Sequence, residues 1–195
     1  YEKMEENIVR YPGLSFNFFL KLSSNTEKRE KYIWDIGSGN DKKRLSIFLD
    51  ENNYMVFRII SELGEVKSVK FDANPIINKG EYLNFEVGRK SKSSFIRLGV
   101  NGQWLASEKV DFNTQFVEDT LFVKWSMLGA DIFCKNGGIF FVTDIFIYKA
   151  TLTISQFIKN KNYLADKYKK PSKGSVYFDG NDCMHIKDPN NPLRR

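Results

Sequence analysis

The sequence contains few of the residue types on which most catalytic and metal sites depend. It has one histidine and two cysteines in 195 residues. No CxxC pair is present, so the spacing typical of a structural zinc site is missing. The P-loop, GxGxxG, HExxH and GxSxG motifs are absent too, which argues against the nucleotide-binding, zinc-protease and serine-hydrolase classes that carry them. We therefore predict that His185, between Met184 and Ile186, is an ordinary surface or half-buried histidine in a strand-like stretch.

Long apolar runs are also missing. No stretch approaches the roughly 20 apolar residues that a membrane helix needs, so we expect no membrane insertion. The sequence opens at Tyr1 without a visible signal peptide, and we expect a fragment or a processed product whose signal could have been removed. Cys134 and Cys183 could pair, but two cysteines define no disulfide framework and leave the compartment open.

What the sequence does contain is apolar surface and positive charge. Hydrophobic residues make up 42% and aromatic residues 15%, which suffices for a large core and excludes wholesale disorder. The net charge of +6 permits an acidic partner such as an anionic glycan, a nucleic acid or a membrane surface. Basic residues alternate with acidic ones almost everywhere, so a solvated surface explains them equally. No basic stripe with interleaved aromatics is present, and we expect no nucleic-acid partner.

Alternation of apolar and polar residues is the dominant pattern, and it is typical of half-buried β-strands. The clearest run places Phe16, Phe18, Leu20 and Leu22 on one face of a strand. Further strands are predicted at residues 43–49, 54–61, 66–71, 81–87, 95–100, 120–125 and 139–149. Turn residues punctuate these runs, and Asn101-Gly102 favours the type I′ turn of a tight hairpin. The spacing predicts a sandwich or barrel rather than alternating β and α units.

The end of the chain has a different pattern. A short helix is predicted near residues 155–166, with a frayed connector as the alternative. Residues 167–174 are charged and contain Pro171 and Gly174, which indicates a linker between a sandwich at residues 1–166 and an extra strand and tail at 175–195.

Taken in order, several segments resemble the concanavalin A-like lectin/glucanase superfamily in its laminin-G-like branch. The resemblance covers roughly residues 16–163. It depends on the segments Tyr32–Gly37, Glu81–Val87, Leu98–Gly102, Gly138–Lys149 and Leu152–Phe157. The resemblance implies an all-β, antiparallel jelly-roll β-sandwich that recognises a ligand at its surface.

One segment departs from the family order. The usual opening strand of the family has no counterpart between Tyr1 and Leu14, yet Val176–Ile186 is similar to it at the other end of the chain. This strand either completes the sandwich in permuted order, pairing with the strand at 145–148, or opens a second copy of the fold. A lone strand would leave its apolar side chains and backbone groups in water, which favours the permuted pairing.

Aromatic residues on the polar side of the strands predict a ligand surface. Sugar rings stack on aromatic rings, while polar side chains orient the hydroxyl groups. Phe19, Phe48, Tyr82 and Phe95 are out of phase with the core positions of their strands. Trp104 and Asn101 lie at the predicted hairpin, and Arg97 shares a face with Phe95. The predicted ligand-binding set is Trp104, Tyr82, Arg97, Phe95, Phe19 and Asn101. Core or loop packing is the alternative role, and it is the one predicted for Trp34 and Trp125.

Other site types have weaker support in the sequence. The resemblance permits calcium at loops that contain Asp35, Asn40, Asp41 and Asp144, although solvated turn residues explain them as well. Glu108 and Asp111 lack the spacing of a retaining glycosidase pair. The basic run at 89–92 is predicted as a hairpin tip that meets a sulfated or carboxylated glycan or is simply solvated.

These observations lead to one preferred function and two alternatives. We expect a non-enzymatic recognition module that binds a glycan or glycoprotein, with an anionic glycan as one option and no required cofactor. It would belong to a larger extracellular, surface-associated or viral protein. The alternatives are a protein-binding or structural sandwich domain without a sugar site, and a glycoside hydrolase or lyase. Fold alone does not separate them.

Overall fold

The computed structural model describes residues 12–37, 40–90, 93–120, 125–167, 176–179 and 184–185. Sheet A contains β1 (Gly13–Leu22), β6 (Gly80–Lys90), β7 (Ser93–Val100), β8 (Gln103–Val110), β10 (Ile139–Tyr148) and β11 (Val176–Asp179). Sheet B contains β2 (Lys31–Gly37), β3 (Arg44–Leu49), β4 (Tyr54–Ile60), β5 (Val66–Asp72), β9 (Trp125–Leu128) and β12 (Met184–His185). The helices are η1 (Asn74–Ile76), α1 (Gln115–Thr120) and α2 (Ile154–Lys167).

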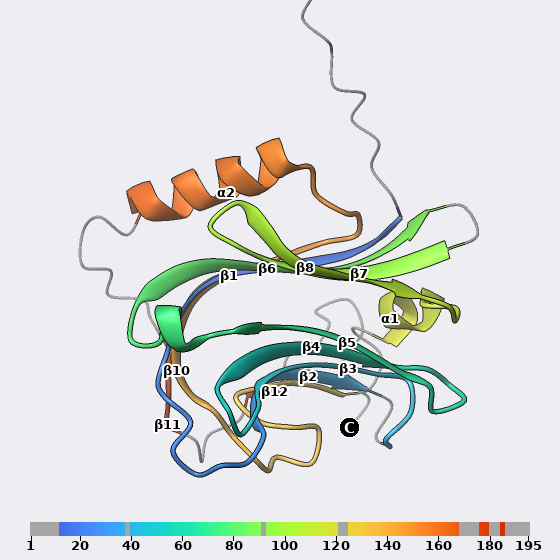
Figure 1. The fold of residues 1–195 in the computed structure, drawn as a ribbon, viewed down its shortest axis with the longest axis horizontal. Helices are drawn as coiled ribbons and strands as arrows, with labels where there is room; N and C mark the ends of the chain where they lie inside the picture. The colour runs from blue at the N-terminus through green and yellow to red at the C-terminus, as the bar shows by residue number, and fades with distance from the viewer. Residues whose placement is uncertain are drawn as a thin grey trace, which may run out of the picture.

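The two sheets pack face to face, and α2 lies across the outer face of sheet A (Figure 1). Sheet A has the order β11-β10-β1-β6-β7-β8, and sheet B has the order β12-β9-β2-β3-β4-β5. Every pairing between these strands is antiparallel. The predicted antiparallel β-sandwich is therefore confirmed. None of the described helices is long and apolar enough to span a bilayer.

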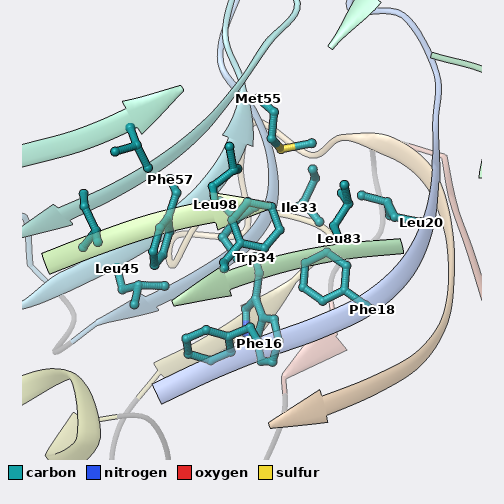
Figure 2. Close-up of a cluster of buried hydrophobic side chains, with 14 of the residues drawn as sticks. Phe16, Phe18, Leu20, Ile33, Trp34, Leu45, Met55, Phe57, Leu83 and Leu98 are labelled. Atoms are coloured by element: carbon teal, nitrogen blue, oxygen red, sulfur yellow. The ribbon is translucent and has the colours of Figure 1, made fainter. Parts of the chain in front are cut away.

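The core lies between the sheets and is built from the alternating positions. Phe16, Phe18, Leu20 and Leu22 all point inward from β1, as predicted. The ring of Trp34 meets that of Phe16 edge-on, with the centroids 5.2 Å apart (Figure 2). Full burial of each large side chain contributes roughly 1.5–3 kcal/mol to folding, so this interior is the main source of stability.

The Asn101-Gly102 turn has the geometry that the sequence predicts. Asn101 has φ 54° and Gly102 has φ 88°, and the turn joins Val100 of β7 to Gln103 of β8. Both central residues of a type I′ turn require positive φ, which asparagine and glycine tolerate best.

Most of the predicted strand at 120–125 lies outside the described residues. Residues 115–120 form α1, residues 121–124 lie outside the described part, and β9 starts at Trp125. The side-chain oxygen of Asn113 accepts a hydrogen bond from the backbone N–H of Gln115, 2.9 Å away, just before the helix. Short apolar runs do not distinguish a helix from a strand by periodicity, and here the local polar contact favours the helical turn.

The strands near the end of the chain pair with both sheets. β11 pairs with residues 139–142 of β10, rather than with the predicted stretch at 145–148. Met184 and His185 of β12 pair with Leu128 and Met127 of β9. The division of the chain at 166 and 174 stays a prediction, because residues 168–175 lie outside the described part.

Candidate ligand-binding surface

The predicted binding residues come together on the outer face of sheet A, beneath α2. Tyr82 is buried, and its ring centroid lies 5.2 Å from that of Phe157 on the helix. The ring centroid of Trp104 lies at the same distance from that of Phe157. Phe19 packs against this group, whose buried members are Tyr82, Phe157 and Leu164. Much of the predicted platform therefore supports the helix.

Arg97 and its neighbours form a second part of this face. The guanidinium group of Arg97 lies 3.8 Å from the Trp104 ring centroid and 5.3 Å from that of Phe95. It donates to the buried carboxylate of Glu86 at 2.6 Å and to the backbone oxygen of Leu152 at 3.0 Å. The side chain of Asn101 donates to Glu81 at the hairpin. The six residues are thus spread along the same side of sheet A, and whether any of them touches a ligand stays a prediction.

None of the described helices lies over the outer face of sheet B, and on β2, β3, β4 and β5 this face carries a basic and aromatic group. We call Glu30, Tyr32, Phe48, Tyr54, Arg58 and Lys70 the Arg58 cluster. Alternation places Tyr54 and Arg58 on this face, because Met55, Phe57 and Ile59 of the same strand point into the core. The sequence pattern puts Phe48 out of phase with the core positions of its strand, and its ring lies beneath Arg58 in the cluster. The sequence analysis missed Arg58.

Arg58 is the centre of this cluster. Its guanidinium carbon lies 4.5 Å from the centroid of the buried Phe48 ring, which itself stacks on Tyr32 at 5.1 Å. The side chain of Arg58 is 21% exposed. Its Nε atom is buried and has no hydrogen-bond partner within the described residues. The stacked ring fixes the plane of the guanidinium group, so its donors are held in one orientation.

One hydroxyl group and one carboxylate accept hydrogen bonds from Arg58. Nη2 of Arg58 donates to the Tyr32 hydroxyl at 2.6 Å, and Nη1 donates to Glu30 at 3.0 Å. The Tyr32 hydroxyl donates in turn to Glu30 at 2.6 Å. Burial raises the pKa of Tyr32, and the hydrogen bond to Glu30 raises it further. The hydroxyl therefore remains a proton donor at neutral pH.

The exposed rim of the Arg58 cluster lies toward β5. Lys70 is exposed, and its ammonium group lies 4.7 Å from the centroid of the half-buried Tyr54 ring. Ser68, which pairs with Arg58 across the strands, is exposed as well. This rim offers one aromatic ring, one hydroxyl group and one cation to a ligand, a combination that suits a sugar with a negative charge.

The other side of this face is closed by an ion pair and a loop. The buried carboxylate of Asp35 accepts from Arg44 at 2.6 Å, from Ser46 at 2.7 Å and from the backbone N–H of Ile132 at 2.8 Å. Burial lowers the pKa of the Arg44 guanidinium, but the hydrogen bonds and negative charge of Asp35, together with the nearby Tyr32 and Asp131, raise the pKa overall. The pair fixes the loop between β9 and β10 onto sheet B.

The residues considered for calcium have other partners in the structure. Asp35 and Asp41 both bind Arg44, and Asp144 binds Lys167. Asn40 accepts a hydrogen bond from the backbone N–H of Lys42. Across the described part of the chain, no group of three His, Cys, Asp or Glu side chains is placed to hold a metal ion.

The remaining candidates from the sequence also have definite positions. A hydrogen bond from Lys109 lowers the pKa of Asp111, the opposite of the shift that a general acid needs. Cys134 is exposed, and Cys183 lies outside the described residues, so their pairing stays a prediction. The side chains of Lys90, Ser91 and Lys92 in the basic run also lie outside the described part.

A shallow hollow of about 300 Å³ lies beside the start of α2. Its lining comprises Tyr148, Ala150, Thr151, Leu152, Gln156, Lys159 and Asn160. Asn160 donates to the Tyr148 hydroxyl at 3.0 Å within it. The hollow is local to one segment of the chain, at the start of α2.

Comparison with solved structures identifies the fold. The carbohydrate-binding module CBM40 of the Ruminococcus gnavus intramolecular trans-sialidase, bound to α2,3-sialyllactose, matches with a TM-score of 0.58 and 14% identity over 77% of this chain and 83% of that one. The chain has the concanavalin A-like lectin fold. No family model matches the sequence, and no curated protein matches it either.

Two larger proteins contain the same fold. The receptor-binding domain of botulinum neurotoxin mosaic serotype C/D matches with a TM-score of 0.55 and 16% identity, over 78% of this chain and 37% of that one. The NanB sialidase of Streptococcus pneumoniae matches with a TM-score of 0.58 and 15% identity, over 75% of this chain and 23% of that one. This concanavalin A-like chain therefore corresponds to one part of each of these proteins.

Proposed function

We propose that this chain is a non-catalytic carbohydrate-binding module that holds an anionic glycan on the outer face of sheet B. The observation that carries the proposal is Arg58, stacked on Phe48 at 4.5 Å, with its Nε atom unpaired among the described residues and its side chain partly exposed. A planar guanidinium group with fixed orientation suits a planar carboxylate better than a flexible ammonium group does.

The rest of the cluster fits the same role. Tyr54 presents a half-buried ring to stack against the apolar face of a sugar, and Lys70 adds a second positive charge beside it. The net charge of +6 would increase the rate at which an anionic glycan approaches. The similar fold of a carbohydrate-binding module solved with sialyllactose supports a sugar ligand, and it does not identify the binding residues of this chain.

We assign the chain to the laminin-G-like branch on its sequence segments. We also place it in a larger protein that is secreted or exposed at a cell or virus surface, where glycans are available. Anionic glycans at such surfaces commonly carry carboxylate or sulfate groups, either of which Arg58 could meet.

The test is a binding titration with sialyllactose as the probe, followed by NMR and by calorimetry. Arg58→Lys keeps the charge and removes the fork of donors, so we expect at least a tenfold loss of affinity, and Tyr54→Ala should weaken binding about three- to tenfold. Arg29→Lys, at an exposed arginine paired with Glu27, is the matched control and should leave binding unchanged. Lys159→Met removes a charge at the hollow beside α2 and serves as a second control.

A variant of Trp104, one of the ligand-binding residues predicted from the sequence, tests the alternative surface on sheet A. If Trp104→Ala abolished sialyllactose binding while Arg58→Lys did not, the ligand surface would be the outer face of sheet A, and the proposal for sheet B would be wrong. Trp104 is half-buried and contacts α2 through Phe157, so circular dichroism of this variant must first confirm that the helix is retained.

A protein partner is the second candidate, and a specific feature favours it. Leu63 and Val66, at the turn between β4 and β5, are 80% and 54% exposed and lie at the edge of the face that carries Arg58. Exposed apolar side chains of this kind are typical of protein contacts. An array of neutral, sialylated and sulfated glycans without a single signal would favour this alternative over sugar binding.

A further inference from the structure

The carboxylate of Glu30 accepts hydrogen bonds from Arg58, the residue that the proposed function assigns to ligand binding. Its two oxygens face Nη1 of Arg58 at 3.0 Å and Nη2 at 3.4 Å. The Tyr32 hydroxyl donates to the same carboxylate at 2.6 Å. One planar carboxylate is therefore met by three donors from two strands, an arrangement that also suits the carboxylate of an acidic sugar.

Glu30 is free to leave this position without loss of the fold. Its side chain is 42% exposed, and it lies in the segment between β1 and β2. The backbone of this segment is held by Asn25, whose side chain donates to the backbone oxygens of Arg29 at 2.5 Å and Asp50 at 2.9 Å. None of these contacts involves the Glu30 carboxylate, so that group can rotate into solvent while the turn stays in place.

The interaction that Glu30 makes is weak enough to exchange. A half-exposed ion pair gains little because water screens both charges and the side chains lose freedom. The donors themselves are more firmly held, because Tyr32 and Phe48 are buried at 3% and 2% exposure beneath Arg58. A mobile acceptor on a rigid set of donors is the arrangement expected of an internal competitor.

We propose that Glu30 is an internal occupant of a carboxylate subsite, which a carboxylate-bearing sugar must displace in order to bind. This inference rests on the proposed function, because it concerns the same surface. It adds that the group recognised on the ligand is a carboxylate rather than a sulfate. It also adds that Glu30 lowers the affinity for this ligand. The apparent dissociation constant for the sugar equals the intrinsic constant divided by the fraction of molecules in which Glu30 has left the subsite.

The experiment compares Glu30→Gln with wild type in titrations with sialyllactose, lactose and a sulfated lactose. The glutamine keeps the size and polarity of the side chain and removes its charge. We expect the affinity for sialyllactose to rise about three- to tenfold, since the subsite becomes vacant in most molecules. Binding of neutral lactose should not change.

Glu27→Gln is the matched control. Glu27 lies in the same segment, its side chain is 48% exposed, and it pairs with Arg29 and Lys31 instead of Arg58. Its substitution raises the net charge by the same amount. An equal gain in both variants would show a general effect of charge and overturn the proposal. A loss of affinity in Glu30→Gln would also overturn it, because Glu30 would then belong to the ligand contacts.

The Nε–H resonance of Arg58 separates failure of this inference from failure of the proposed function. In wild type, sialyllactose should shift this resonance, and Glu30→Gln alone should shift it before any sugar is added. If sialyllactose shifted it but Glu30→Gln left the affinity unchanged, only the inference about Glu30 would fall. If sialyllactose did not shift it in either protein, the proposed function and the inference would both fall. Stronger binding of the sulfated lactose would overturn the carboxylate assignment.

Discussion

The buried carboxylate of Glu86 accepts a hydrogen bond from the backbone N–H of Leu152, 2.7 Å away. Glu86 lies in the middle of sheet A, and Leu152 lies in the segment that leads from β10 to α2. The same carboxylate accepts from the Ser15 hydroxyl at 2.9 Å and from Arg97 at 2.6 Å. One acidic side chain therefore ties the helical cover of sheet A to the sheet itself.

We expect Glu86→Ala to destabilise the fold by about 3–5 kcal/mol, because it removes one partner of a buried ion pair and leaves several donors unsatisfied. Urea unfolding followed by circular dichroism measures the change. Glu108→Ala, at an exposed position on β8 of the same sheet, is the control and should change the free energy of unfolding by less than about 0.5 kcal/mol. Equal effects in the two variants would refute the role of Glu86.

The turn between β7 and β8 contacts α2 at Gly102. A Cβ atom at Gly102 would lie 2.7 Å from the side chain of Ile158 on the helix. Gly64 has a similar φ of 92°, but a Cβ there meets nothing closer than 3.9 Å. Gly102→Ala should therefore cost more than Gly64→Ala, since both variants share the backbone strain and only one has the clash.

The clash can be isolated by a double-mutant cycle. In an Ile158→Ala background, Gly102→Ala should cost about as much as Gly64→Ala, because the obstructing side chain is gone. Thermal unfolding of the four proteins provides the comparison. An undiminished cost in that background would mean that Ile158 does not contact the hairpin.

Phe157 is the principal apolar anchor of α2. It is fully buried between Tyr82 and Trp104, whose ring centroids both lie 5.2 Å away. Phe157→Ala should cost about 3–5 kcal/mol or release the helix from the sheet. Amide hydrogen exchange across residues 154–167 distinguishes the two results. Ile154→Ala, at a position 56% exposed, should leave exchange unchanged.

The buried pair of Asp35 and Arg44 gives a prediction about the loop on sheet B. Arg44→Met leaves the Asp35 carboxylate buried with fewer donors, and we expect a loss of about 3–5 kcal/mol. Arg29→Met breaks an exposed pair and should cost less than about 1 kcal/mol. Limited proteolysis should cut the loop between β9 and β10 faster in Arg44→Met. Equal cleavage in the two variants would contradict the tethering role.

Much of the fold followed from local pattern. The inward positions of β1, β3, β6 and β7 were predictable because alternation with a period of two places every second side chain on the same face. The helix predicted near 155–166 forms at 154–167, and the Asn101-Gly102 turn forms as expected. These features depend on neighbours within a few residues, and such neighbours are visible in the sequence.

The candidate surface was less predictable. The phase of Phe19, Phe48, Tyr82 and Phe95 predicted that they leave the core side of their strands, but it did not show that Phe48 lies on sheet B and the other three on sheet A. Periodicity gives the face of a residue but says nothing of what covers it. The segment that covers Tyr82 comes from residues 75 positions later, at Phe157, and no local pattern encodes that contact.

The sequence by itself determined that this protein is an antiparallel β-sandwich with aromatic side chains on both faces of its strands, since strand period and turn chemistry are local properties. Only the tertiary structure decided which outer face is covered. Helix α2 packs on sheet A, so the rings of Tyr82 and Phe157 bury one another, while no described helix covers the outer face of sheet B. That choice depends on contacts between segments far apart in the chain, where burial and charge pairing, rather than local propensity, set the free energy.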